Sequence, residues 1–179
     1  QLEFTDLRLI QTEKSKHKNV RASSDNLRRA REVADGIKEA LHGCVLAFGE
    51  VPSGGQSADA VHAFGIVIGL YASLPVPMIE VNPSETKMAA VGTRTASKQE
   101  MIEWAGERFP NAPWLTRKLK GEVVLTAANE HLADAVAVAH AGVRTPEFRQ
   151  VVAMVRAASP TVSLASANAT GLLLSLEDK

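Results

Sequence analysis

The stretch Asn129-Glu130-His131-Leu132-Ala133-Asp134-Ala135-Val136-Ala137 places two acids and an imidazole on an otherwise small and apolar segment. On a helix, Asp134 lies one turn from both Glu130 and His131, so the three side chains can converge on one point. Such a cluster can bind a hard cation, and charges that face a sheet need a partner or a metal. The spacing equally allows a solvated helix start, in which Glu130 favours the positive end of the helix dipole.

Size and composition bound the class of protein. The chain has 179 residues, of which 45% are hydrophobic and 22% charged, as in a single soluble domain covering residues 1–179. No apolar run is long enough to cross a bilayer, and we expect a cytoplasmic protein. Cys44 is the one cysteine, which excludes an internal disulfide and a thiolate zinc cage, and we interpret it as a buried small hydrophobe.

Charge is balanced overall but gathers near the N-terminus. The chain has twenty basic and twenty acidic residues. Between residues 14 and 31, Asp25 stands against a run of basic residues: Lys14, Lys16, Lys18, Arg21, Arg28, Arg29 and Arg31. Such a patch can bind the phosphates of a nucleic acid, and a merely solvated loop and helix face would have the same composition.

The apolar pattern predicts alternating strands and helices. Apolar runs bounded by glycine predict strands buried on both faces, and capped segments with apolar residues on one face predict helices. The predicted strands are residues 2–10, 44–48 and 76–81, and the predicted helices are residues 23–41 and 57–72. A change of phase near Asp6 predicts an irregularity in the first strand. The alternation is typical of an α/β domain with a partly parallel sheet.

The second half of the chain is mostly helical in pattern. Ser97-Lys98-Gln99-Glu100 is a capping box that opens a helix, and Pro146 is placed to begin the last one. Residues 109–125 have the pattern of a variable connection. Residues 162–176 then predict a strand, a turn and a second strand, and joined to residues 1–4 they would form a hairpin. We therefore expect residues 160–179 to supply the first strand of the sheet, through circular permutation or because the chain is given in rotated order.

In rotated order the chain resembles the RuvC family of Holliday-junction resolvases, especially its phage-type members, within the ribonuclease H-like superfamily. The resemblance covers nearly the whole chain and rests on the order and spacing of short motifs. These are Thr170-Gly171, Thr12 to Ser15, Arg28 to Arg31, Glu50, Asn82 to Lys87, Gly92 to Lys98, and Asn129 to Ala135. The implied fold is a ribonuclease H-like α/β fold with a mixed central sheet flanked by helices.

The resemblance also implies two divalent cations, Mg²⁺ or Mn²⁺, in each active site. Glu50 matches the family's strand-end glutamate, Asp134 its helix aspartate, and His131 the helix position one turn before that aspartate. Glu130 would be an accessory ligand or would position water. Lys87 and Lys98 match basic positions that face the DNA. Together with the N-terminal patch, the residues expected to bind DNA are Lys14, Lys16, Lys18, Arg21, Arg28, Lys87 and Lys98.

One position departs from the family pattern. The first-strand aspartate is expected six residues before Gly171, where this chain has Ala165, or seven before it, where the chain has Leu164. Neither side chain binds a metal. We interpret Ala165 as the replacement of a catalytic aspartate, which would make this chain an inactive variant. If the alanine is native, catalysis is in doubt and DNA binding is not.

The implied function is resolution of four-way DNA junctions by two-metal-ion phosphodiester hydrolysis in a homodimer. The apolar helix 57–72 is the candidate dimer interface, although packing against the sheet would equally explain its surface. Two alternatives stay open: a non-catalytic binder of branched DNA, which a native Ala165 would favour, and a ribonuclease H-like nuclease for forks, flaps or RNA-DNA hybrids. His42, His62 and His140 show no partner pattern, and we assign them no function.

Overall fold

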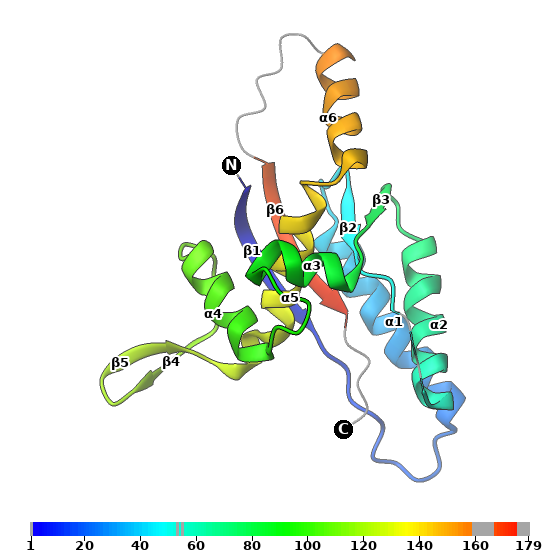
Figure 1. The fold of residues 1–179 in the computed structure, drawn as a ribbon. Coiled ribbons are helices and arrows are strands. Elements are labelled where there is room, and N and C mark those ends of the chain that lie inside the picture. The colour runs from blue at the N-terminus through cyan, green and yellow to red at the C-terminus, as the bar shows by residue number, and fades with distance from the viewer. Residues whose placement is uncertain (1, 53, 55, 159–166, 175–179) are drawn as a thin grey trace.

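The structure, a computed structural model, describes residues 2–52, 54, 56–158 and 167–174. Helices and short strands alternate along the chain, which confirms the α/β class (Figure 1). The strands are β1 (Leu2–Ile10), β2 (Ala47–Gly49), β3 (Met78–Glu80), β4 (Thr116–Leu119), β5 (Glu122–Leu125) and β6 (Ala167–Leu174). The helices are α1 (Ala22–Ala40), α2 (Ala58–Ala72), α3 (Pro83–Val91), α4 (Lys98–Arg108), η1 (Ala127–Asn129), α5 (Glu130–Gly142) and α6 (Pro146–Ala158).

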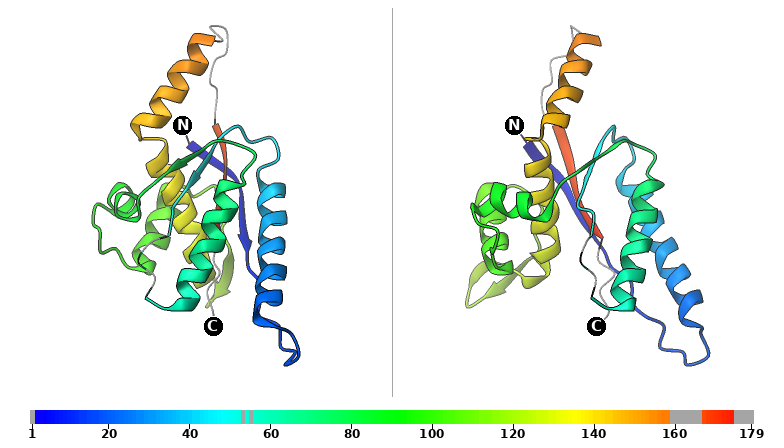
Figure 2. Two further views of the ribbon diagram at one scale, coloured as in Figure 1. Left: turned by 90° about the vertical axis from the view of Figure 1, so that its right-hand side faces the viewer. Right: turned by 45° about the vertical axis from the view of Figure 1, so that its right-hand side comes forward.

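The described strands form three two-stranded sheets, where the sequence predicted one mixed central sheet. β1 pairs with β6 and β2 with β3, both in parallel, and β4 and β5 form an antiparallel hairpin. Helices α1 and α2 lie on one side of the β1–β6 pair, and α3, α4 and α5 lie on the other side (Figures 1 and 2). None of the helices in the described ranges is long and apolar enough to cross a membrane.

The C-terminal segment differs from its prediction. Residues 167–174 form one strand that continues through Thr170 and Gly171, where a turn was expected, because pairing with β1 holds this segment extended. The pairing is parallel, so the expected antiparallel hairpin with the N-terminus is wrong. Parallel neighbours need a long crossover, and here all six α-helices of the described residues lie between β1 and β6 in the sequence. Ala165 lies outside the described residues.

Several local predictions can be compared directly. The register of β1 shifts between Phe4 and Asp6, which confirms the predicted irregularity. The predicted capping box of Ser97 and Glu100 is present, and Ser57 also caps α2 by accepting a hydrogen bond from the Ala60 amide. The strand predicted at 44–48 is only three residues long and begins at Ala47, so Cys44 is half-buried in the segment before the strand and not within it.

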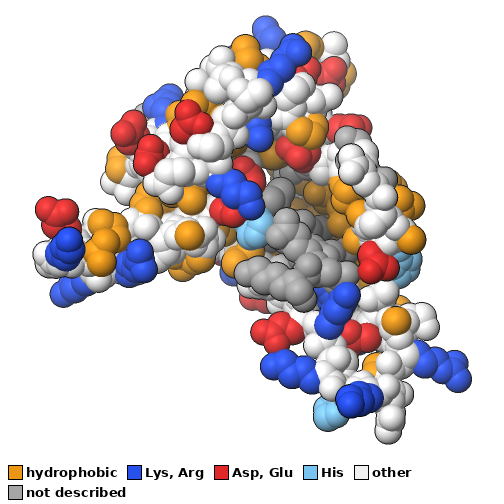
Figure 3. Space-filling model, turned by 60° about the horizontal axis from the view of Figure 1, so that its bottom comes forward, with side chains coloured by type: hydrophobic (Ala, Val, Ile, Leu, Met, Phe, Trp, Pro, Cys, Tyr) orange, Lys and Arg blue, Asp and Glu red, His pale blue; other side chains and the backbone are white. Residues whose placement is uncertain are grey.

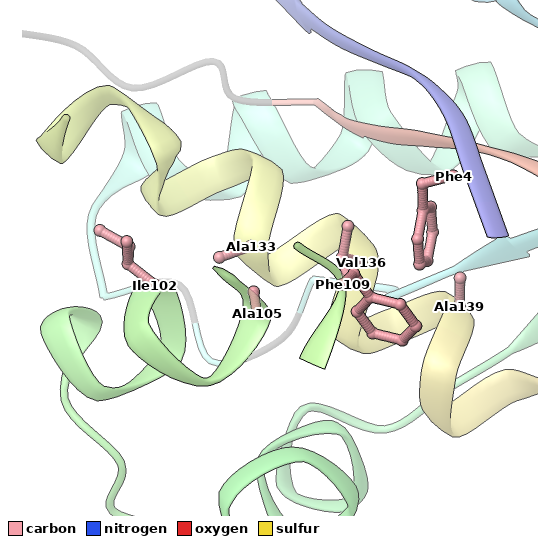
Figure 4. Packing of buried hydrophobic residues seen from close by; sticks show 7 residues of the cluster. All are labelled: Phe4, Ile102, Ala105, Phe109, Ala133, Val136 and Ala139. Atoms are coloured by element: carbon pink, nitrogen blue, oxygen red, sulfur yellow. The ribbon is translucent and has the colours of Figure 1, made fainter. Parts of the chain in front are cut away.

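The core is built around α5. Its small residues let it pack closely on its neighbours: Ala133 and Ala137 are fully buried, and Ala139 is nearly so. One cluster joins α5 to α4 and β1, as Figure 4 shows for its seven members, Phe4, Ile102, Ala105, Phe109, Ala133, Val136 and Ala139. α5 also packs against β2 and α3. This packing fixes the helix that carries the predicted site residues.

Candidate functional site

Two of the predicted site residues, Glu50 and Asp134, come together from distant parts of the chain. Glu50 directly follows β2, and Asp134 lies in the second turn of α5, which packs against β2. Both side chains are half-buried. Burial raises the pKa of the Glu50 carboxyl, and the negative charge of Asp134 raises it further. A half-buried carboxyl whose ionisation is opposed by a second carboxylate is an arrangement that a bound cation stabilises.

Asp134 also interacts with the start of its own helix. Burial raises the pKa of Asp134, and the charge of Glu130 acts in the same direction, whereas His131 lowers it. Glu130 is engaged in an ion pair with Lys98, with 2.5 Å between Nζ and Oε1. Glu130 and His131 thus lie close enough to Asp134 for their charges to affect its pKa, but among the described residues the three do not form a group that could hold a metal ion, and Glu130 pairs with Lys98.

Lys87 is the basic residue next to both carboxylates. Its charge lowers the pKa of Glu50 and of Asp134. The side chain is half-buried, and Nζ donates a hydrogen bond of 3.2 Å to the carbonyl of Ala96. Lys87 thus lies inside the carboxylate site, while Lys98 lies at its exposed rim.

The donor chemistry suits a hard cation. Carboxylate oxygens are the ligands that Mg²⁺ prefers, and Mg²⁺ is commonly held by one or two carboxylates with water completing its shell. Within the described ranges, no three His, Cys, Asp or Glu side chains are grouped closely enough to hold a metal ion. Glu50 and Asp134 are the carboxylates that would hold such a cation.

Tyr71 was not singled out in the sequence and belongs to the surroundings of Glu50. Burial and the charge of Glu50 together raise the pKa of Tyr71 to about 12, so its phenol stays neutral. A Cβ built on Gly49 would lie 3.4 Å from Cζ of Tyr71. The chain has one tyrosine, and its position at the end of a mostly apolar helix was the signal that could have revealed it.

The N-terminal basic segment is held against the start of α1. Asp25 is buried, and it accepts hydrogen bonds from the Ser15 amide (2.9 Å) and from Arg28 (2.7 Å). These two contacts keep the pKa of Asp25 below its usual value. Arg28 also donates to the Glu13 carbonyl and pairs with Glu32. Arg28 therefore orders the loop, while the loop's exposed basic residues are Lys14, Lys16, Lys18 and Arg21.

The three histidines without an assigned function lie outside the carboxylate site. His42 and His62 are exposed. His140 is 5% exposed and lies edge-on to Trp104 and Phe109, with ring centroids 5.1 and 5.8 Å away. Burial, followed by the charges of two nearby arginines, lowers the pKa of His140 to about 4. His140 is therefore a neutral core residue at pH 7.

The chain was also compared with known proteins. No family model and no curated protein matches it. Among solved structures, Thermus thermophilus RuvC is similar at 22% identity and a TM-score of 0.43, over 68% of this chain and 70% of that chain. T. thermophilus RuvC in complex with a Holliday junction substrate is similar at 19% identity and the same TM-score and coverage. The assignment of function therefore rests on the residues of this chain.

Proposed function

We propose that the protein is a divalent-metal-dependent nuclease that acts on four-way DNA junctions. The observation that carries this proposal is the proximity of Glu50, at the end of a strand, to Asp134, on the central helix. The charge of Asp134 raises the pKa of the Glu50 carboxyl. The resemblance of the sequence motifs to the RuvC family supplies the substrate class. The basic N-terminal loop of this chain supplies exposed cations that can bind the DNA backbone.

The roles of the residues follow from their positions. Glu50 and Asp134 would hold Mg²⁺ or Mn²⁺, which activates water and neutralises charge on the phosphate when bound. Lys87 lowers the pKa of both carboxyls and so favours the ionised forms that bind a cation. His131 is an imidazole rather than an oxygen ligand, so it suits orientation of the attacking water or binding of Mn²⁺ better than binding of Mg²⁺. Glu130 fixes Lys98 beside the same site.

A second candidate function is a non-catalytic binder of branched DNA. The observation that favours it is Ala165, at the position where the resemblance places a third carboxylate. Without that carboxylate the two-cation mechanism lacks a ligand, while the basic residues are unaffected. The two candidates share a DNA partner and differ in cleavage alone.

We also propose that two copies act together through α2. Only Val67 of this apolar helix is buried. Val61 and Ile68 are 58% and 48% exposed, and a Cβ built on Gly65 or Gly69 would meet nothing within 4 Å. A strip of small and apolar side chains favours close helix pairing, and a resolvase needs two sites on one face. Sedimentation should show a dimer that Ile68→Glu converts to a monomer; a monomeric parent chain would contradict this.

The test of function is cleavage of a labelled four-way junction in Mg²⁺ or Mn²⁺ by the chain and by its Ala165→Asp variant. Paired symmetric nicks by the variant alone identify a metal-dependent resolvase that lacks one ligand. Adding Glu50→Gln to the active variant should abolish cleavage and leave junction binding intact. Tight junction binding without cleavage by either chain supports the binder. Preference for duplexes, forks or RNA-DNA hybrids would contradict the junction assignment.

A further inference from the structure

The β4–β5 hairpin projects from the body of the molecule beyond α4 (Figure 1). Its strands pair antiparallel from Thr116 opposite Leu125 to Leu119 opposite Glu122. Lys120 and Gly121 form the turn, and both have positive φ values of 50° and 91°, as in the turn that suits a two-residue hairpin. An isolated two-stranded hairpin is at best marginally stable in water. This one is therefore an element that the body must hold in place.

The body holds it through Asn129, the residue directly before α5. Asn129 is fully buried. Its Oδ1 accepts from the Leu115 amide at 3.0 Å, and its Nδ2 donates to the carbonyls of Leu115 (2.7 Å) and Thr126 (3.1 Å). The Thr126 amide also donates to the Leu115 carbonyl at 3.0 Å. One amide thus ties both strands of the hairpin, at their base, to the helix that carries Asp134.

The projecting part is strongly basic. All four residues of β4 are exposed, and so are Lys120 at the turn and the first half of β5. Three cations, Arg117, Lys118 and Lys120, stand against the single acid Glu122. Among the residues that the structure describes, none of these four forms an ion pair. Their charges are therefore available to an anionic partner.

Two large apolar side chains lie among these cations. Leu119 is 48% exposed, and Val123, directly across from Lys118, is 66% exposed. Figure 3 shows basic side chains on this arm, at the left, and on the loop before α1, at the lower right, on one face of the molecule. A partner that spans this face would need negative charge over a long distance. It would also need apolar surface at the hairpin tip.

We propose that the β4–β5 hairpin is a DNA-contacting arm. Arg117, Lys118 and Lys120 bind backbone phosphates, and Leu119 and Val123 contact bases that are exposed where the strands of a branched DNA part. Nucleic acid fits both features, because its phosphates pair with the cations and apolar side chains pack on unstacked bases. This inference rests on the proposed function. It adds a contact surface that the N-terminal loop and the carboxylate site do not provide.

The test compares two matched double variants of the full chain in binding a labelled four-way junction over a range of salt concentrations. Lys118→Gln with Lys120→Gln neutralises the arm, and Lys38→Gln with Arg156→Gln removes the same charge from α1 and α6. Loss of two phosphate contacts should lower the slope of log affinity against log salt by roughly 1 to 2. The control should keep the parent slope. Because these side chains are exposed, both variants should keep the parent Tm.

The apolar tip is tested separately with Leu119→Ser and Val123→Ser combined. This variant should keep the salt slope and lose part of its preference for a junction over a duplex of the same length. If the Lys118→Gln, Lys120→Gln variant keeps the parent's affinity for the junction and the parent's salt dependence, the inference is overturned and the proposed function stands. A parent chain that does not bind the junction would overturn both.

Discussion

The two ends of α5 place the same residue type in opposite surroundings. At the N-terminal end, His131 lies half-buried beside Glu130 and Asp134, and its charge influences the pKa of Asp134. At the C-terminal end, His140 is buried, and its pKa is lowered to about 4. A histidine on an apolar helix is therefore not a site by itself. Nearby carboxylates define the first environment, and aromatic packing defines the second.

The stability of the protein should be more sensitive to added side-chain volume at the C-terminal end of α5 than at an exposed helix position. A Cβ built on Gly142 would lie 2.2 Å from Cδ1 of Phe48, a ring on β2 two residues before Glu50. Gly142→Ala should therefore destabilise the protein by about 1 to 3 kcal/mol, the usual cost of overpacking. Denaturant unfolding measures this change. Ala153→Leu on α6 adds volume at an exposed position, so it is the control and should cost little. Equal losses in both variants would contradict the close packing of α5.

The pH dependence of stability separates the two histidines. Because the folded pKa of His140 is about 4, below its ordinary value of 6.5, the unfolded chain takes up a proton that the folded chain does not. The contribution of His140 to stability is therefore lost as the pH falls from 6.5 towards 4. His140→Leu should flatten that part of the stability profile, and His131→Leu should keep it. A profile that His140→Leu leaves unchanged would show that His140 titrates normally.

Removing the charge of Glu50 or of Asp134, at the N-terminal end of α5, should stabilise the protein. The pKa values of Glu50 and Asp134 are raised above their ordinary values of 4.5 and 3.8. The folded protein therefore loses stability as the pH rises from these ordinary values through the raised ones and the two carboxyls ionise. Without divalent cations, Glu50→Gln and Asp134→Asn should each raise the Tm at pH 7 by a few degrees. The gain should disappear in acid, where the parent carboxyls are protonated. A lower Tm at pH 7 would mean that the pair stabilises the fold.

The sequence predicted the parts of the fold that local chemistry determines. The capping box at Ser97 located a helix start, and the spacing of Glu130, His131 and Asp134 predicted that they lie on one helix. Strand pairing was predicted less well, because a local pattern does not specify which strand lies alongside which. The pattern of residues 162–176 therefore predicted two strands joined by a turn, although the described part, residues 167–174, is a single strand paired with β1.

The site was predicted in part. The motif order suggested that Glu50 and Asp134 belong together, and the packing of α5 on β2 accounts for their proximity. The β4–β5 hairpin was missed, because its charged residues break the alternation that marks a half-buried strand. The role of Asn129 was missed because nothing in its own sequence neighbourhood indicates a bond to Leu115.

The most direct test of the account is a thermal melt of the chain at pH 7 with increasing Mg²⁺ or Mn²⁺. A cation bound by Glu50 and Asp134 should raise the Tm in a saturable way, with about 1.4 kcal/mol of stabilisation at ten times its Kd. Glu50→Gln combined with Asp134→Asn should abolish the rise, while the exposed pair Glu107→Gln and Glu147→Gln should keep it. An equal rise in both double variants, or none in the parent chain, would contradict a metal site at these two carboxylates.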